Sequence, residues 1–230
     1  MTAENLAQDH ETKPTKGRRD YTLGEEIANS IIHGLGIGLS VAALVMLVSF
    51  AVMSQGLDRP YRIAAAIVYG ITLVFEYTAS TLYHSFPQPR VKHLFKIFDH
   101  CGIYLLIAGS YTPFCLVTLR GTIGWWMFGV IWGIAAVGIA LEAFVAYRPR
   151  WLSAAVYLAM GWLVIFSIKP LMAGLDTAGL WLLVAGGLAY TVGTVFYVLK
   201  RVKYMHAVWH VWVLAGSVCH FLAVLLFVMR

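Results

Sequence analysis

Charge is scarce in this chain of 230 residues. Asp, Glu, Lys and Arg together make up 12 %, about half of what a soluble domain carries, whereas hydrophobic residues make up 60 %. This composition argues against a soluble globular protein and indicates that lipid surrounds most of the chain. We therefore interpret the net charge of +6 as a sign of membrane topology, and we expect no nucleic-acid partner.

Cysteine is also scarce, and a cleavable signal peptide is absent. Cys101, Cys115 and Cys219 fall in apolar stretches without a Cys-x-x-Cys motif, which predicts small core residues and no disulfide framework. Residues 1–26 are polar and of mixed charge, without the apolar core of a secretion signal. We expect this segment to be a disordered cytoplasmic arm, followed by a transmembrane domain over residues 27–230.

Apolar runs long enough to cross a bilayer as helices, about 20 residues each, are the main feature of the chain. There are seven: Ile27–Ser54, Ile63–His84, Ile97–Leu119, Ile123–Tyr147, Leu152–Ile168, Ala178–Leu199 and His206–Met229. We predict an all-α membrane protein, a seven-transmembrane helix bundle. Its short connections make consecutive helices antiparallel neighbours, and Pro113 is expected to kink the third span.

The basic residues predict the orientation of the bundle. With the N-terminus in the cytoplasm, 12 of the 17 lysines and arginines lie in cytoplasmic segments and the other five, Lys169 among them, lie outside. This distribution follows the positive-inside rule. Because the number of spans is odd, the C-terminus is predicted to lie outside.

Ionisable side chains within the predicted spans are few, and by default they suggest a functional site. Four spans bring such residues to the predicted cytoplasmic face: His33, His84, Asp99, His206 and His210. The orientation rests on lysine and arginine alone, so the agreement in depth of these five residues is independent evidence for a shared site.

The stretch YMHAVWHVW, Tyr204–Trp212, carries a metal-binding pattern. His206 and His210 are four residues apart, so one helix face presents two ring nitrogens, as in many zinc sites. A third histidine from another helix and a water would complete a tetrahedron, with the nitrogens converging to within about 4 Å. The alternative is that these imidazoles only extend to the membrane interface. No His-Glu-x-x-His motif is present, so the pattern is not that of a zincin protease.

Two further side chains would equip such a site for hydrolysis. Asp99 is a candidate to orient or deprotonate a metal-bound water. Ser80 lies one helical turn from His84 and is a candidate to donate a hydrogen bond to a carbonyl oxygen that becomes an oxyanion. We assign no catalytic role to Glu76, one turn deeper.

The first span adds a stripe of polar residues that approaches from the same side. Glu25, Asn29 and His33 follow at i, i+4 and i+8, which makes them candidates for the surroundings of the metal ligands. Glu25 has a second interpretation, because Thr22 and Glu25 form the Thr-x-x-Glu pattern of a helix capping box.

Three sequence blocks resemble a known family. They are EEIANSIIHGLG, then STLYHSF followed by FDHCGIYLLIAGSYTPF, and finally HAVWHVWVLAGSVCHF. In this order, between Glu25 and His220, they resemble the hemolysin III proteins, bacterial members of the progestin and adipoQ receptor (PAQR) family. The resemblance implies a multi-pass protein of the bacterial inner membrane, with Zn²⁺ near the cytoplasmic face. It implies His84, His206 and His210 as ligands, a water held by Asp99, and Ser80 in the site.

The same residue set is shared with alkaline ceramidases, so the resemblance also implies zinc-dependent hydrolysis of a lipid amide or ester, with a membrane lipid as substrate. One alternative is a non-catalytic, zinc-stabilised membrane-homeostasis protein, sensor or receptor. Another is a cytolysin, as the family name suggests, although seven permanent spans without a secretion signal do not favour a secreted pore-former. The oligomeric state is left open.

Overall fold

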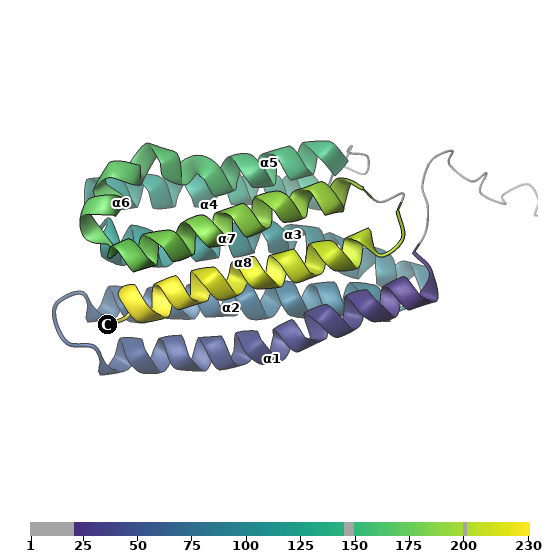
Figure 1. Cartoon of the computed structure of the whole chain (residues 1–230), viewed down its shortest axis with the longest axis horizontal. Helices are drawn as coiled ribbons and strands as arrows, with labels where there is room; N and C mark the ends of the chain where they lie inside the picture. The colour runs from purple at the N-terminus through teal and green to yellow at the C-terminus, as the bar shows by residue number, and fades with distance from the viewer. Residues whose placement is uncertain (1–20, 145–149, 200–201) are drawn as a thin grey trace, which may run out of the picture.

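The computed structural model describes residues 21–144, 150–199 and 202–230, and the regular structure in these ranges is entirely helical. Seven helical segments in them are long and apolar enough to cross a membrane, which confirms the predicted bundle of seven spans (Figure 1). The elements are α1 (Leu23–Met53), α2 (Arg59–Ser85), α3 (Pro89–Pro113), a π-helix (Phe114–Thr118), α4 (Thr122–Phe144), α5 (Arg150–Trp162), a 3₁₀-helix (Leu163–Ser167), α6 (Ile168–Gly174), α7 (Thr177–Val198) and α8 (Met205–Phe227). Most of the predicted arm, residues 1–20, lies outside the described ranges.

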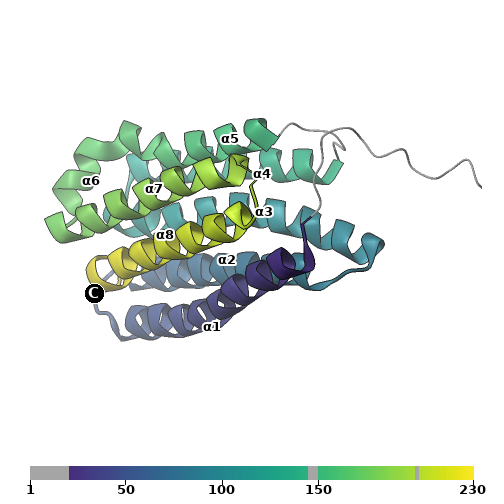
Figure 2. The ribbon, with the colours of Figure 1, turned by 45° about the vertical axis from the view of Figure 1, so that its right-hand side comes forward.

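The helices run side by side along the long axis of the molecule (Figures 1 and 2). Helix α1 packs against α2 and α8, α2 against α3, and α3 against α4, while α7 packs against α8 and α5. A further contact between α3 and α5 brings the first and second halves of the chain together. The beginnings of α1 and α8 lie at the same end of the bundle as the end of α2 (Figure 1).

Helix α1 begins with a capping box and continues with a lipid-facing stripe. The Thr22 hydroxyl accepts the Glu25 N–H at 3.4 Å, and the Glu25 carboxylate accepts the Thr22 N–H at 2.9 Å, so two backbone donors at the helix start are satisfied. Ile27, Ile31 and Leu35 follow at intervals of four residues and are all exposed. This spacing places them on one face, which is the face expected to meet acyl chains.

The third and fifth spans differ from their predicted bounds. Helix α3 begins at Pro89, eight residues before the predicted Ile97. The prediction was based on apolar runs, so it left out these first turns, which are amphipathic and carry charge. The α-helical part of α3 ends at Pro113 and continues as a π-helix, while the predicted kink at this proline stays a prediction. The fifth span continues through α6 to Gly174. Lys169, predicted to lie in an outer loop, is therefore inside this span's helix.

The interruption of the fifth span is stabilised by a tyrosine of α3. The Tyr111 hydroxyl accepts the Val164 N–H at 2.9 Å and donates to the Gly161 carbonyl at 2.7 Å. Backbone groups released from a regular helix inside a membrane need such partners. Tyr111 thus allows α5 to pass into a 3₁₀-helix without leaving these groups unpaired.

Candidate metal centre

Three histidines converge where the end of α2 meets the beginning of α8. The ring centroids of His84, His206 and His210 are 4.5 Å apart for the pair within α8, and 5.3 and 5.1 Å apart from His84 to His206 and His210. One possible ligand atom of each residue lies within 4.8 Å of the other two. We call the end of the bundle that holds these residues the histidine end.

The three rings fit a metal ion in chemistry and nearly in spacing. Zinc–nitrogen bonds of 2.0–2.1 Å place tetrahedral ligands about 3.3 Å apart, so side-chain shifts of about 1 Å would close the triangle. The spread of 4.8 Å exceeds the expected convergence to about 4 Å. His84 Nε2 and His210 Nδ1 are buried and have no hydrogen-bond partner among the described residues, and a metal ion would satisfy such atoms. The group can therefore hold a metal ion.

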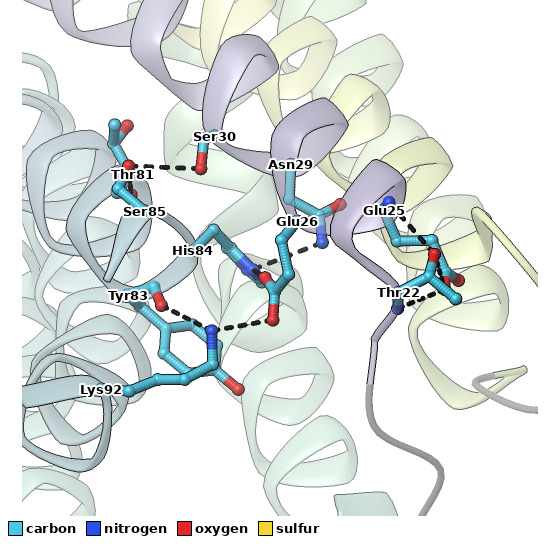
Figure 3. Close-up of polar contacts among 10 residues, drawn as sticks. All are labelled: Thr22, Glu25, Glu26, Asn29, Ser30, Thr81, Tyr83, His84, Ser85 and Lys92. Carbon is cyan, nitrogen blue, oxygen red and sulfur yellow. Dashed lines mark hydrogen bonds and ion pairs between the residues drawn. The ribbon is translucent and has the colours of Figure 1, made fainter. Parts of the chain in front are cut away.

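His84 is held from the side opposite its unpartnered nitrogen (Figure 3). Its Nδ1 lies 2.5 Å from Glu26 Oε2, and Glu26 Oε1 lies 2.7 Å from Lys92 Nζ. The Asn29 amide lies 3.3 Å from the same Nδ1. Asn29, a member of the predicted stripe, is therefore next to a candidate ligand, and Glu26 was not among the predicted residues. Glu26 lies outside the i, i+4, i+8 stripe. The only sequence signal for it is its position three residues before Asn29 in the pattern EExxN.

Glu25 takes the structural role that its spacing from Thr22 allowed. Besides the capping box, its Oε1 accepts the backbone N–H of Tyr204 at 2.9 Å. Tyr204 precedes α8 with φ of 62°, a left-handed conformation that is uncommon outside glycine. Glu25 thus ties the beginning of α1 to the beginning of α8, two residues before His206.

The third member of the predicted stripe, His33, lies against a candidate ligand. Its ring stacks on that of His210 with centroids 3.7 Å apart, and it meets the Tyr77 ring edge-on at 5.0 Å. Tyr77 is in turn fixed by a hydrogen bond of 2.8 Å to Ser217 of α8. A second hydroxyl, that of Tyr190 in α7, lies 2.9 Å from the same serine oxygen.

The two predicted catalytic side chains are buried at the histidine end. Ser80 is fully buried, and its hydroxyl has no hydrogen-bond partner in the described part of the chain. Asp99 is 8 % exposed and lines a small crevice together with His206 and Tyr197. Asp99 thus shares this crevice with His206, and Ser80 lies one helical turn before His84 in α2, while the roles of both remain predictions.

A cavity of about 220 Å³ extends from the histidine end into the bundle. Asp99, His206 and His210 line it at one end, and most of the remaining wall is apolar. Apolar wall residues from α3, α5, α6, α7 and α8 include Leu106, Leu158, Leu171, Leu183 and Val213. A cavity with one polar end and long apolar walls suits an amphipathic ligand better than a small ion alone.

Comparison with known proteins agrees with this architecture. The family model described as "Haemolysin-III related" matches residues 21–221. The hemolysin-3 homolog of Bacillus subtilis (strain 168) is 43 % identical over 210 residues, which cover 91 % of this chain and 97 % of that protein. Hemolysin-3 of Bacillus cereus is 45 % identical over 205 residues, covering 89 % of this chain and 92 % of that protein.

A more distant relative comes from animals. The monocyte to macrophage differentiation factor of Homo sapiens is 29 % identical over 220 residues, covering 92 % of this chain and 87 % of that protein. This relative supports the predicted relation to the PAQR family. No solved structure matches the chain significantly. A bundle of seven spans, three converging histidines and a family match over most of the chain lead to one conclusion: the protein belongs to the haemolysin-III related family.

Proposed function

We propose that this protein is a zinc-dependent hydrolase of a lipid amide or ester, with His84, His206 and His210 as metal ligands. The observation that carries the proposal is that these three histidines converge and that two of them, His206 and His210, line one end of a largely apolar cavity. A structural metal site needs no such cavity, whereas a lipid hydrolase needs room for an acyl chain beside the reacting carbonyl. The proposal places the site near the cytoplasmic face of a bacterial inner membrane.

In this proposal the side chains around the histidines have separate roles in the hydrolysis. A zinc ion would supply Lewis acidity and a bound water of low pKa. The Asp99 carboxylate would orient that water and accept its proton, and it would then return the proton to the leaving amine or alkoxide. The Ser80 hydroxyl, which no described residue engages in a hydrogen bond, would donate one to the carbonyl oxygen as negative charge develops there.

The cavity supports a membrane lipid as the substrate. Its apolar walls are provided mainly by α3, α5, α7 and α8, so an acyl chain that leaves the bilayer would exchange one apolar environment for another. The reacting group would then reach the histidine end, where the polar side chains lie. Substrates without a long apolar chain should therefore be poor ones.

The experiment has two parts. Metal content is measured in purified wild-type protein and in the His206→Ala/His210→Ala variant, and the proposal expects about one zinc per chain in the former and a clear loss in the latter. Release of fatty acid is then measured with a panel of amide- and ester-linked lipids in mixed micelles. Equal metal content in both proteins would overturn the metal site, and no turnover of any lipid by the zinc-loaded protein would overturn the hydrolase.

The alternative is a non-catalytic metal site, and one feature of the structure supports it. His84 lies at the end of α2, and His206 and His210 lie at the start of α8, so a bound ion would fasten these two helices together. In that case metal removal would lower the unfolding temperature, and zinc-loaded protein would show no turnover.

A further inference from the structure

The surroundings of His84 contain an acidic side chain whose role the sequence does not reveal. Glu26 belongs to α1, yet its carboxylate reaches α2 and α3 (Figure 3). One oxygen, Oε2, contacts His84 Nδ1, and the other, Oε1, pairs with Lys92 Nζ. The Glu26 side chain is 16 % exposed and that of His84 is fully buried, so the contact is shielded from bulk water.

The contact decides which nitrogen of His84 carries the proton. An ionised carboxylate can only accept hydrogen bonds, so the contact with Glu26 requires a proton on Nδ1. Neutral imidazole then has its lone pair on Nε2, the buried atom for which the described residues offer no hydrogen-bond partner. This tautomer leaves Nε2 ready to bind a metal ion.

Asn29 fits the same arrangement once its amide is turned. Its Nδ2 lies 3.3 Å from His84 Nδ1, while its Oδ1 is buried without a partner among the described residues. The two amide atoms are nearly interchangeable in shape. With the amide turned, its oxygen would face the Nδ1 proton as a second, longer acceptor beside Glu26, and the amide nitrogen would take the place of Oδ1.

Lys92 pairs with the second oxygen of the same carboxylate. Its ammonium group contacts Glu26 Oε1 at 2.7 Å and donates to the Tyr83 carbonyl at 3.1 Å, at the last turn of α2. The carboxylate oxygens thus have separate partners, one on α2 and one on α3. A shielded carboxylate without Lys92 would carry an uncompensated charge, which is costly.

We propose that Glu26 is the positioning residue of the candidate metal ligand His84, and that it sets the tautomer and ring orientation that direct Nε2 toward the metal. The inference rests on the metal site of the proposed function, but it does not depend on catalysis. Carboxylates that hold a metal-binding histidine in this way typically contribute 10- to 100-fold to metal affinity.

The test measures zinc affinity of the full-length protein in detergent by competition with a chromophoric chelator. Glu26→Leu should bind zinc about 10- to 100-fold more weakly than the wild type. Glu26→Gln keeps an oxygen that can accept the Nδ1 proton, so its affinity should fall between the two. Lys92→Met removes the partner of Oε1 but keeps the carboxylate that contacts His84, so it should weaken binding less than Glu26→Leu does.

Two controls separate positioning from a loss of structure. Asp58→Leu removes a comparable carboxylate, which pairs with Arg62 at 2.9 Å at the other end of α2, and it should leave zinc affinity unchanged. Cobalt(II) absorption spectra provide a readout that a purely structural role would not change. The visible bands of the cobalt-loaded Glu26→Leu protein should shift, while those of Asp58→Leu should match the wild type.

Several outcomes would overturn the inference: zinc affinity of Glu26→Leu within twofold of wild type, an unchanged cobalt spectrum, or an equal loss of affinity in Lys92→Met and Glu26→Leu. The last result would show that Glu26 serves only as an ion pair between helices. Failure of the proposed function looks different, because the wild-type protein would then bind no zinc or would bind it without hydrolysing lipid.

Discussion

The rings of His33 and His210 are stacked, with their centroids 3.7 Å apart and their planes inclined by only 16°. Both side chains are buried, and neither nitrogen of His33 has a hydrogen-bond partner among the described residues. His33 therefore contacts the candidate ligand through its ring face. The arrangement restricts the ring of His210, because His33 is itself packed against Tyr77 in a T-shaped contact.

This stack predicts different results for two substitutions of His33. His33→Ala opens a cavity beside His210, so it should destabilise the protein by about 2–5 kcal/mol and weaken zinc binding. His33→Phe preserves a planar ring and removes two unpaired polar atoms, so its zinc affinity should stay close to that of the wild type. Thermal unfolding in detergent and chelator competition measure the two effects. Loss of zinc binding by His33→Phe would contradict a packing role and would indicate that a His33 nitrogen takes part.

Ser80 and Asp99 should affect turnover without releasing the metal. Ser80→Ala removes a hydrogen bond that the account assigns to the transition state, and it should lower kcat by about 100- to 1,000-fold. Asp99→Asn removes the proton acceptor and should abolish measurable turnover. Zinc content, measured on the same preparations, should equal that of the wild type. A zinc-free Asp99→Asn protein would instead indicate that Asp99 is itself a ligand.

The capping box of α1 offers a matched pair of variants. Thr22→Ala removes the cap and should destabilise the protein by about 0.5–2 kcal/mol. Glu25→Ala keeps the backbone N–H that the Thr22 hydroxyl accepts, but it removes the acceptors of the Thr22 N–H and of the Tyr204 N–H, so it should cost about 1 kcal/mol more than Thr22→Ala. Unfolding midpoints of the two metal-free proteins measure the difference. Equal midpoints would show that the tie between α1 and α8 contributes nothing.

A close contact between α2 and α3 predicts that the effects of two substitutions depend on each other. A methyl group at Gly102 would overlap Oε2 of Glu76, whose side chain fills the space beside that glycine. Gly102→Ala should therefore destabilise the protein by about 1–3 kcal/mol. In a Glu76→Ala background the added methyl group has more space, so Gly102→Ala should destabilise the protein less. The better helix propensity of alanine offsets the remaining loss of stability. An identical cost in both backgrounds, measured by thermal unfolding, would contradict the contact.

The number of spans and the convergence of the three histidines could be predicted from the sequence for a simple physical reason. A bilayer imposes one length on every crossing helix, so apolar runs count the spans. Antiparallel connections then place His84, at the end of the second span, at the same depth as His206 and His210, at the start of the seventh. The family resemblance supplied the choice of His84 over His33.

Other features depend on packing that a hydropathy pattern does not contain. The extra turns of α3 carry Arg90, Lys92 and Lys96. Because these residues are charged, a search for apolar runs does not include those turns. The continuation of the fifth span depends on Tyr111 of another helix, whose hydroxyl satisfies the broken backbone. Glu26 was missed because its importance follows from the rotation of α1 against α2, and Glu25 beside it fitted the polar stripe better.

X-ray absorption at the zinc edge of the purified protein is the sharpest test of the three-histidine centre, since it reports the atoms bound to the metal without requiring a substrate. We expect a bound zinc ion with three imidazole nitrogens and one oxygen at about 2.0–2.1 Å. The His206→Ala/His210→Ala variant should lose this signal. A wild-type protein without zinc, or with ligands at about 2.3 Å as expected for sulfur, would contradict a three-histidine centre.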